Sequence, residues 1–124
     1  MNPAEFGALG LKIEVAPIST RFSKDIAAKT RAFHEAHKQG ATLEEISDFL
    51  VAISYSLLRD AYKTVNLPMT EPEFEAKTLI DEVIGFLSQQ VEVNGPRDFL
   101  LAPLGVLLKN ASNLADVVEN AKGD

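Results

Sequence analysis

Cysteine and tryptophan are absent from this chain of 124 residues, and histidine and tyrosine each occur only twice. The absence of cysteine excludes disulfides, thiolate catalysis and cysteine-ligated zinc or iron–sulfur sites. It also fits a reducing compartment, so we expect a cytoplasmic protein. Two tyrosines without any tryptophan offer little for stacking on nucleic-acid bases.

Long apolar runs are missing as well. The longest is FLLAPLGVLL, at residues 99–108, which is far short of the ~20 residues needed to cross a bilayer. The first residues, MNPAEFGALGLKIEV, lack the basic region and the long apolar run of a signal peptide. We therefore expect neither a membrane partner nor a targeting segment.

Positive charge is scarce in most of the chain. The net charge is −6, and it is unevenly distributed. Residues 1–38 hold six basic and four acidic residues, whereas residues 39–124 hold six basic and fourteen acidic ones. Because such an acidic chain repels phosphate backbones, a nucleic-acid partner is not expected.

Helical periodicity is what the sequence has in abundance. Apolar residues recur at spacings of three and four in three segments, at residues 20–39, 43–64 and 71–91. Thr42 with Glu45, and Thr70 with Glu73, have the spacing of a capping box. These two pairs predict where the second and third helices begin.

Proline interrupts the C-terminal apolar segment, at residues 97–110. Pro103 lacks an amide hydrogen and clashes with the preceding turn, so we expect the helix to kink or stop near Ala102. A shorter helix is expected at residues 113–120. Near the other end, Leu11, Ile13 and Val15 alternate with polar residues, which indicates a short strand or an extended arm.

The predicted fold is all-α. It is a small bundle of three main helices with a broken C-terminal helical segment and an extended N-terminal arm. One domain is expected over residues 1–124. It consists of an arm at residues 1–19, a helical bundle at 20–120 and a frayed tail at 121–124.

The two histidines are the first candidates for catalysis or metal binding. His34 and His37 are three residues apart, so they share a helix face. No further ligand and no orienting partner is spaced beside them, as a metal or a catalytic imidazole requires. We interpret them as surface histidines near a helix C-terminus, where positive charge is favoured.

Carboxylates and serines give no stronger signal. The pairs Glu44/Glu45 and Asp81/Glu82 are not combined with His or Lys at a spacing that suggests acid–base chemistry. Ser54 lies in an apolar helix without the sharp turn of a nucleophile elbow, and we expect its hydroxyl to bond back to the helix. We predict no catalytic residue, no metal, no cofactor and no enzyme activity.

The stretch at residues 99–108 is apolar on every face of the helix that it would form. A small bundle can rarely cover all faces of its last element. We therefore expect part of this surface to contact another chain, while the rest packs in the core. The predicted partner-binding residues are Phe99, Leu101, Leu104, Val106 and Leu108.

Residues 41–90 resemble a known family. The run ATLEEISDFLVAISYSLL, the break at VNLPMTEPEFEAK and the acidic amphipathic stretch TLIDEVIGFL are similar to the tail assembly chaperones of long-tailed bacteriophages. The resemblance implies a small, acidic, mostly helical protein without catalytic residues. It also implies that such a protein binds the tape-measure protein in the cytoplasm of the bacterial host and helps the tail-tube proteins assemble around it.

Three functions stay open at this point. The first is a non-enzymatic assembly chaperone or adaptor that binds apolar helical segments of a partner, as in phage tail assembly. The second is a helical structural or regulatory subunit that forms homo-oligomers through its C-terminal apolar segment. The third, which we do not favour, is an enzyme that uses the face of His34 and His37.

Overall fold

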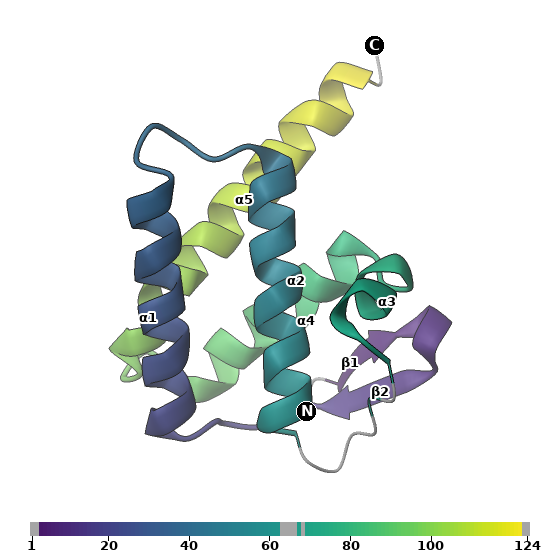
Figure 1. Ribbon diagram of the computed structural model, residues 1–124, viewed down its shortest axis with the longest axis vertical. Helices are drawn as coiled ribbons and strands as arrows, with labels where there is room; N and C mark the ends of the chain where they lie inside the picture. The colour runs from purple at the N-terminus through teal and green to yellow at the C-terminus, as the bar shows by residue number, and fades with distance from the viewer. Residues whose placement is uncertain (1–2, 63–66, 68, 123–124) are drawn as a thin grey trace.

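The computed structural model describes residues 3–62, 67 and 69–122, and it is mostly helical with one small sheet (Figure 1). The strands are β1 (Pro3–Phe6) and β2 (Leu11–Glu14), and 3-10 turns occur at Gly7–Leu9 and Phe99–Leu101. The α-helices are α1 (Thr20–Ala36), α2 (Leu43–Asp60), α3 (Glu71–Ala76), α4 (Ile80–Asn94) and α5 (Ala102–Lys122). None of these helices is long and apolar enough to cross a membrane.

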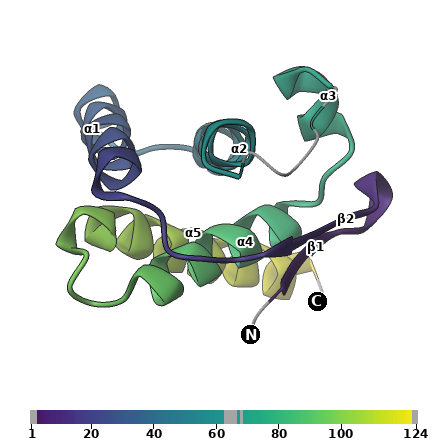
Figure 2. The ribbon, with the colours of Figure 1, turned by 90° about the horizontal axis from the view of Figure 1, so that it is seen from below.

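The helices form two layers. Figure 2 shows α1, α2 and α3 on one side and α4 and α5 on the other, with the strands beside α4. The first helix begins where its periodicity predicts, and its buried face includes Ile26 and Thr30. It ends at Ala36, three residues before the predicted end.

The N-terminal arm is a β-hairpin, so the purely all-α prediction was wrong. β1 pairs antiparallel with β2, and Phe6 faces Leu11 in the register. The chain reverses through Gly10, whose φ of 65° is readily adopted only by glycine. Ala4, Phe6 and Ile13 are buried against the helices, which supplies the support that an isolated hairpin lacks.

The capping box of the second helix is confirmed. The Glu45 N–H donates to Thr42 Oγ1 at 3.1 Å, and the Thr42 N–H donates to Glu45 Oε1 at 2.9 Å. These bonds satisfy backbone donors that the first turn would otherwise leave free. The helix ends at Asp60, whereas we predicted residue 64; residues 63–66 lie outside the described residues.

The predicted helix at residues 71–91 is two helices. Thr70 caps the first, with the Glu73 N–H donating to Thr70 Oγ1 at 3.4 Å. The break at residues 77–79 turns the chain so that Phe74 packs against Phe6, with 5.7 Å between the ring centroids. The interval of six residues between Phe74 and Ile80 already departs from helical spacing.

The C-terminal segment is not broken at Pro103. A 3-10 turn comes first, and α5 is then continuous from Ala102 to Lys122. Pro103 therefore lies in the first turn of α5, where its missing N–H would have no intrahelical partner anyway. Gly105 lies on the face of α5 toward α4, where a Cβ built on it would lie 3.5 Å from Val91 Cγ1, an ordinary contact distance.

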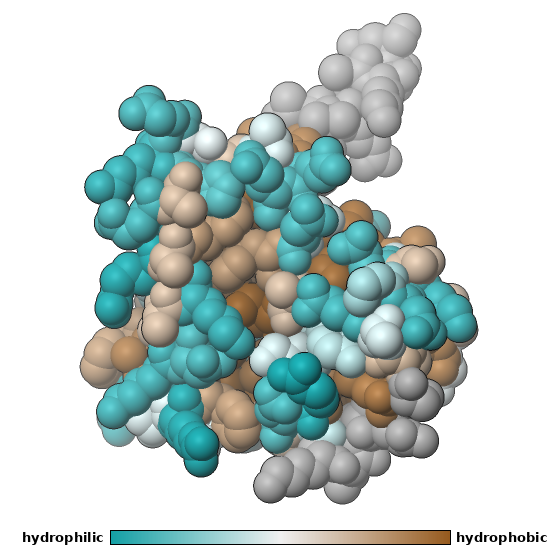
Figure 3. Space-filling view, viewed as in Figure 1, coloured by the Kyte–Doolittle hydropathy of each residue, from teal (hydrophilic) through white to brown (hydrophobic). Residues whose placement is uncertain are grey.

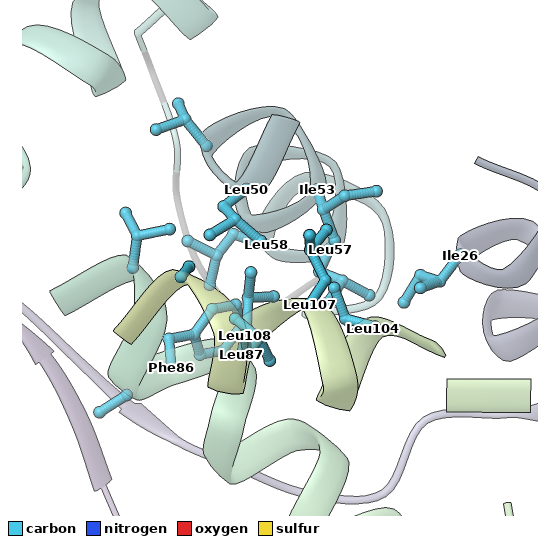
Figure 4. Packing of buried hydrophobic residues seen from close by; sticks show 14 of the residues in the cluster. Ile26, Leu50, Ile53, Leu57, Leu58, Phe86, Leu87, Leu104, Leu107 and Leu108 are labelled. Carbon is cyan, nitrogen blue, oxygen red and sulfur yellow. The ribbon is translucent and has the colours of Figure 1, made fainter. Parts of the chain in front are cut away.

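One apolar core joins the two layers. Figure 4 shows Leu57 and Leu58 of α2 among Leu104, Leu107 and Leu108 of α5. These five side chains are at most 5% exposed. The core also includes buried residues of the hairpin, α1 and α4.

A polar network holds the link between β2 and α1 to α4. Gln90 is fully buried, and its Nε2 donates to the Ala16 carbonyl at 2.8 Å and to Asn94 Oδ1 at 2.9 Å. Gln90 Oε1 accepts from the Tyr62 hydroxyl. Asn94 Oδ1 also accepts from the Ile18 N–H at 3.0 Å. The apolar stripes of the sequence give no sign of this network.

Candidate functional site

The structure divides the five predicted partner-binding residues between core and surface. Leu101, Leu104 and Leu108 are 1%, 1% and 2% exposed, so they pack within the chain. Phe99 and Val106 are 75% and 59% exposed. Of the predicted set, only Phe99 and Val106 therefore remain available to a partner on this surface.

A second apolar surface was not predicted. An open groove of about 260 Å³ lies where the first turns of α2 and α4 meet the middle of α5. We call it the α2–α4–α5 groove. It is lined by Leu43, Glu44, Ile46, Ser47, Leu50, Ile80, Ile84 and Ala111.

Exposed apolar side chains gather around this groove. The described residues include six large apolar side chains that are exposed by 38–75%, at Leu43, Leu79, Ile80, Phe99, Val106 and Leu114. Leu43 and Ile80 line the groove, and Leu79 directly precedes Ile80. Leu114 lies one helical turn beyond Ala111 on α5. Two of the six thus line one groove, and a third, Leu114, lies one helical turn along α5 from it.

The beginnings of α2 and α4 share one pattern at the groove. In each helix an exposed apolar residue comes first, at Leu43 and Ile80, and two acids follow. The second acid caps the helix: Glu45 accepts from the Thr42 N–H, and Glu82 Oε1 accepts from the Leu79 N–H at 2.8 Å. The first acid of each pair is exposed and is Glu44 or Asp81.

Glu82 also connects the groove side of α4 to the hairpin. Its Oε2 accepts from the Gly7 N–H at 2.8 Å. One carboxylate therefore fixes both the start of α4 and the turn after β1. This contact holds Ile80, the first residue of α4, in a defined place beside the groove.

A different hollow runs between α1 and α2, and Figure 3 shows its apolar floor between hydrophilic walls. It measures about 470 Å³, and Phe33 and Phe49 in its lining stack with 4.6 Å between ring centroids. Lys29 and Arg59 also line it, and each forms an ion pair within the chain. None of the six exposed large apolar side chains lines this hollow.

His37 has an orienting partner, contrary to our prediction. Its Nε2 lies 2.8 Å from Glu45 Oε2, and its Nδ1 lies 2.9 Å from the Phe33 carbonyl oxygen. The hydrogen bond to that carbonyl, and then the Glu45 carboxylate, raise the pKa of His37. Glu45 is eight residues away on the next helix, so helical spacing within one helix could not reveal the pair.

The remaining chemical candidates form no cluster. His34 is exposed on α1. The Ser54 hydroxyl is buried and has no hydrogen-bond partner among the described residues, so the expected bond back to the helix was wrong. Within residues 3–62, 67 and 69–122, no group of three or more His, Asp or Glu side chains is placed to hold a metal ion.

No protein-family model, curated protein or solved structure matches this chain. The function is therefore inferred from the surface of the chain itself.

Proposed function

We propose that this protein is a non-enzymatic assembly chaperone or adaptor that binds an apolar helical segment of a protein partner in the α2–α4–α5 groove. The observation that carries the proposal is that Leu43 and Ile80 are exposed and line that groove, with the exposed Leu114 one helical turn from Ala111. Exposed apolar side chains that line a common groove favour a site for a protein partner.

The shape of the groove favours a helix as the bound element. A groove between helices accepts the apolar face of an amphipathic helix through anchors at i, i+3, i+4 and i+7. Its volume of about 260 Å³ lies just below the usual range of small-molecule sites, which are also more enclosed. One or two apolar anchors of a docked helix suit such a groove better than a whole small ligand.

The side-chain chemistry supports a role without catalysis. Both ring nitrogens of His37 are engaged, with Phe33 and with Glu45. Neither nitrogen is free to accept a proton from a substrate, as a general base must. The groove itself is lined by apolar residues, one serine and one glutamate.

The resemblance of residues 41–90 to phage tail assembly chaperones supports a more specific form of this proposal. In that form the partner is the tape-measure protein, whose long apolar helices need cover before the tail tube surrounds them. A long helical protein and tail genes encoded next to this chain would favour that form. Their absence would leave the general adaptor.

Peptide binding tests the proposal. The probe is a labelled synthetic peptide of about 18 residues, or five helical turns, with leucines on one face. We expect saturable binding in fluorescence anisotropy, weakened at least about tenfold by Ile80→Glu, because a buried apolar anchor contributes about 1.5–3 kcal/mol. Val106→Glu is the matched control, because it places the same charge on an exposed residue of α5 that does not line the groove. It should leave binding unchanged. Absence of binding, or equal binding by Ile80→Glu, would overturn the proposal.

A second candidate function rests on Phe99 and Val106. Among the described residues they are two of the three most exposed large apolar side chains, and neither lines the groove. They belong to the turn before α5 and to α5 itself. This exposure favours a subunit that forms homo-oligomers through its C-terminal segment. Light-scattering mass tests it: the wild type should exceed the monomer mass of 13.5 kDa, and Phe99→Glu should restore that mass. A wild-type monomer at high concentration rules it out.

A further inference from the structure

We propose that the helix bound in the α2–α4–α5 groove carries lysine or arginine beside its apolar face, so the partner is a basic amphipathic helix. This inference rests on the proposed function and adds the charge of the partner. It starts from Glu44 and Asp81, the first acids of α2 and α4. Both are exposed, and Glu44 lines the groove.

The fold does not use these two carboxylates as it uses their neighbours. Glu45 and Glu82 hold the backbone of their own helix starts, and each also contacts another element. The ion pairs among the described residues all involve other carboxylates than Glu44 and Asp81. Interaction with the helix dipole explains an acid in the first turn, but it does not explain the exposed leucine or isoleucine directly before it.

Together the two helix starts present the same recognition element twice. Each offers an apolar side chain for burial, Leu43 or Ile80, followed by a carboxylate on the surface. Lysine and arginine suit such a pair, because their aliphatic stems cover apolar surface while their charged ends stay in water. A helix with leucines on one face and basic residues at the edges of that face can bury Leu43 and Ile80 and pair with the carboxylates that follow them.

The charge around the groove agrees with this partner. Glu44 is the charged residue among those that line it. Residues 39–124, which supply every lining residue, hold fourteen acidic and six basic residues. Such a surface attracts a basic segment and repels an acidic one. An anionic lipid surface or a nucleic acid is disfavoured for the same reason.

Two labelled peptides with one leucine face test the inference, one with lysine and the other with glutamate at the edges of that face. In low salt we expect the wild type to bind the lysine peptide about tenfold more tightly, and the advantage should shrink in 0.5 M salt, where screening is strong. Reversal of both charges, Glu44→Lys with Asp81→Lys, should make the glutamate peptide the tighter ligand.

The control compares two positions on α4. Asp81→Asn should weaken binding of the lysine peptide about threefold to fivefold, which is the upper part of the range for an exposed ion pair. Glu92→Gln removes the same charge from an exposed position eleven residues later, which is about 16 Å along the helix. It should change binding less than twofold. If the two variants had equal effects, the preference for the lysine peptide would come from the net charge of the chain and not from Asp81 at the groove. That result would overturn the inference.

The outcomes separate this inference from the proposed function. If both peptides bind equally and Ile80→Glu weakens both, the groove binds helices without regard to charge, and only the inference fails. If neither peptide binds, the proposed function fails with it. If the chain forms dimers that Ile80→Glu dissociates, the groove is occupied by a second copy, and a basic partner helix is excluded.

Discussion

His37 Nε2 lies 2.8 Å from Glu45 Oε2, so one contact connects the end of α1 to the first turn of α2. Its Nδ1 faces a second acceptor, the Phe33 carbonyl oxygen at 2.9 Å. Only the protonated imidazole can donate to both acceptors at once. Glu45 meanwhile accepts from the Thr42 N–H. The capping of α2 and the position of the α1 end are therefore coupled through one carboxylate.

This coupling predicts a pH-dependent contribution to stability. The pKa of His37 is raised by its carbonyl and carboxylate contacts, so its contribution is complete below its ordinary pKa of 6.5 and disappears as the pH rises through the folded-state value. The pKa of Glu45 is lowered by hydrogen bonds from Thr42 and then from His37. Its contribution is present above the ordinary carboxyl pKa and disappears at lower pH.

We expect the coupling between His37→Gln and Glu45→Gln to be larger at about pH 5.5 than at about pH 8.5. Glutamine at position 45 keeps an oxygen that can accept from the Thr42 N–H. The double-mutant cycle therefore measures the effect of the Glu45 charge without loss of the capping box. Chemical unfolding of the wild type, both single variants and the double variant at each pH measures the coupling. Equal coupling at the two pH values would show that His37 is neutral in its contacts.

The second prediction concerns the start of α2. Thr42→Ala removes the acceptor for the Glu45 N–H, and we expect a loss of about 1 kcal/mol in the free energy of unfolding. Ser19, the equivalent residue at α1, makes no side-chain capping bond. Ser19→Ala should therefore cost much less in the same urea titration. Equal losses would mean that the two caps are equivalent in solution.

The third prediction concerns the C-terminal segment. Leu101 is 1% exposed and Val106 is 59% exposed. Leu101→Glu buries an unpaired carboxyl group and should cost several kcal/mol, enough to unfold a small domain. Val106→Glu should stay within about 0.5 kcal/mol of the wild type. Thermal melting followed by circular dichroism compares them, and a similar fall in melting temperature for both would place Val106 in the core as well.

The fourth prediction concerns Gly105, on the face of α5 toward α4. The nearest atom to an added methyl group would be Val91 Cγ1 at 3.5 Å, an ordinary van der Waals distance. Gly105→Ala should raise the free energy of unfolding by about 0.5–1 kcal/mol, because glycine is the weaker helix former. Gly10→Ala is the contrast, since its φ of 65° strains any other residue and should make the variant less stable. A destabilised Gly105→Ala would mean that α4 and α5 pack more tightly than these distances imply.

Local signals predicted the starts of α1, α2 and α3, but they did not predict the hairpin, the break between α3 and α4 or the continuous α5. The bonds between Thr42 and Glu45 span three residues, so the spacing of these two residues in the sequence was enough to predict the start of α2. β1 could not be recognised in the same way, because Pro3–Phe6 is too short for a pattern and is a strand only through its pairing with β2. Pro103 was misjudged because its effect depends on where the helix begins. At an interior position it breaks a helix, and in the first turn it is accepted.

The candidate site, too, could be predicted from the sequence only in part. Phe99 and Val106 belong to a segment that is apolar on all faces, and the exposure of part of that segment could be expected from the sequence. The groove depends on how close the starts of α2 and α4 lie to Ala111 of α5. These three segments are far apart in the chain, and no spacing within any one of them encodes their meeting. The sequence does contain one local sign of the groove. At the start of both α2 and α4, one apolar residue is followed by two acids.

The last prediction contrasts two neighbouring glutamines on α4. Gln90 is fully buried and bonded to Ala16, Tyr62 and Asn94. Gln90→Met keeps the length of the side chain but removes its hydrogen bonds to the Ala16 carbonyl, the Tyr62 hydroxyl and Asn94. The Ala16 carbonyl then keeps only the Tyr62 hydroxyl as a donor, at 3.2 Å. We expect a loss of about 1–3 kcal/mol in the free energy of unfolding. The link between β2 and α1 should also exchange its amide hydrogens faster, because the network holds that link to α4.

Gln89 should respond in the opposite way. Its Oε1 is buried and has no hydrogen-bond partner within the described residues. Gln89→Met removes an unsatisfied acceptor and adds apolar contact, so the variant should be as stable as the wild type or more stable. Urea unfolding of both variants measures the difference, and hydrogen exchange at Ala16 and Ile18 locates it. If Gln89→Met destabilised the chain as much as Gln90→Met, the loss would come from packing on α4 in general, and the network would not be what holds the link between β2 and α1 to α4.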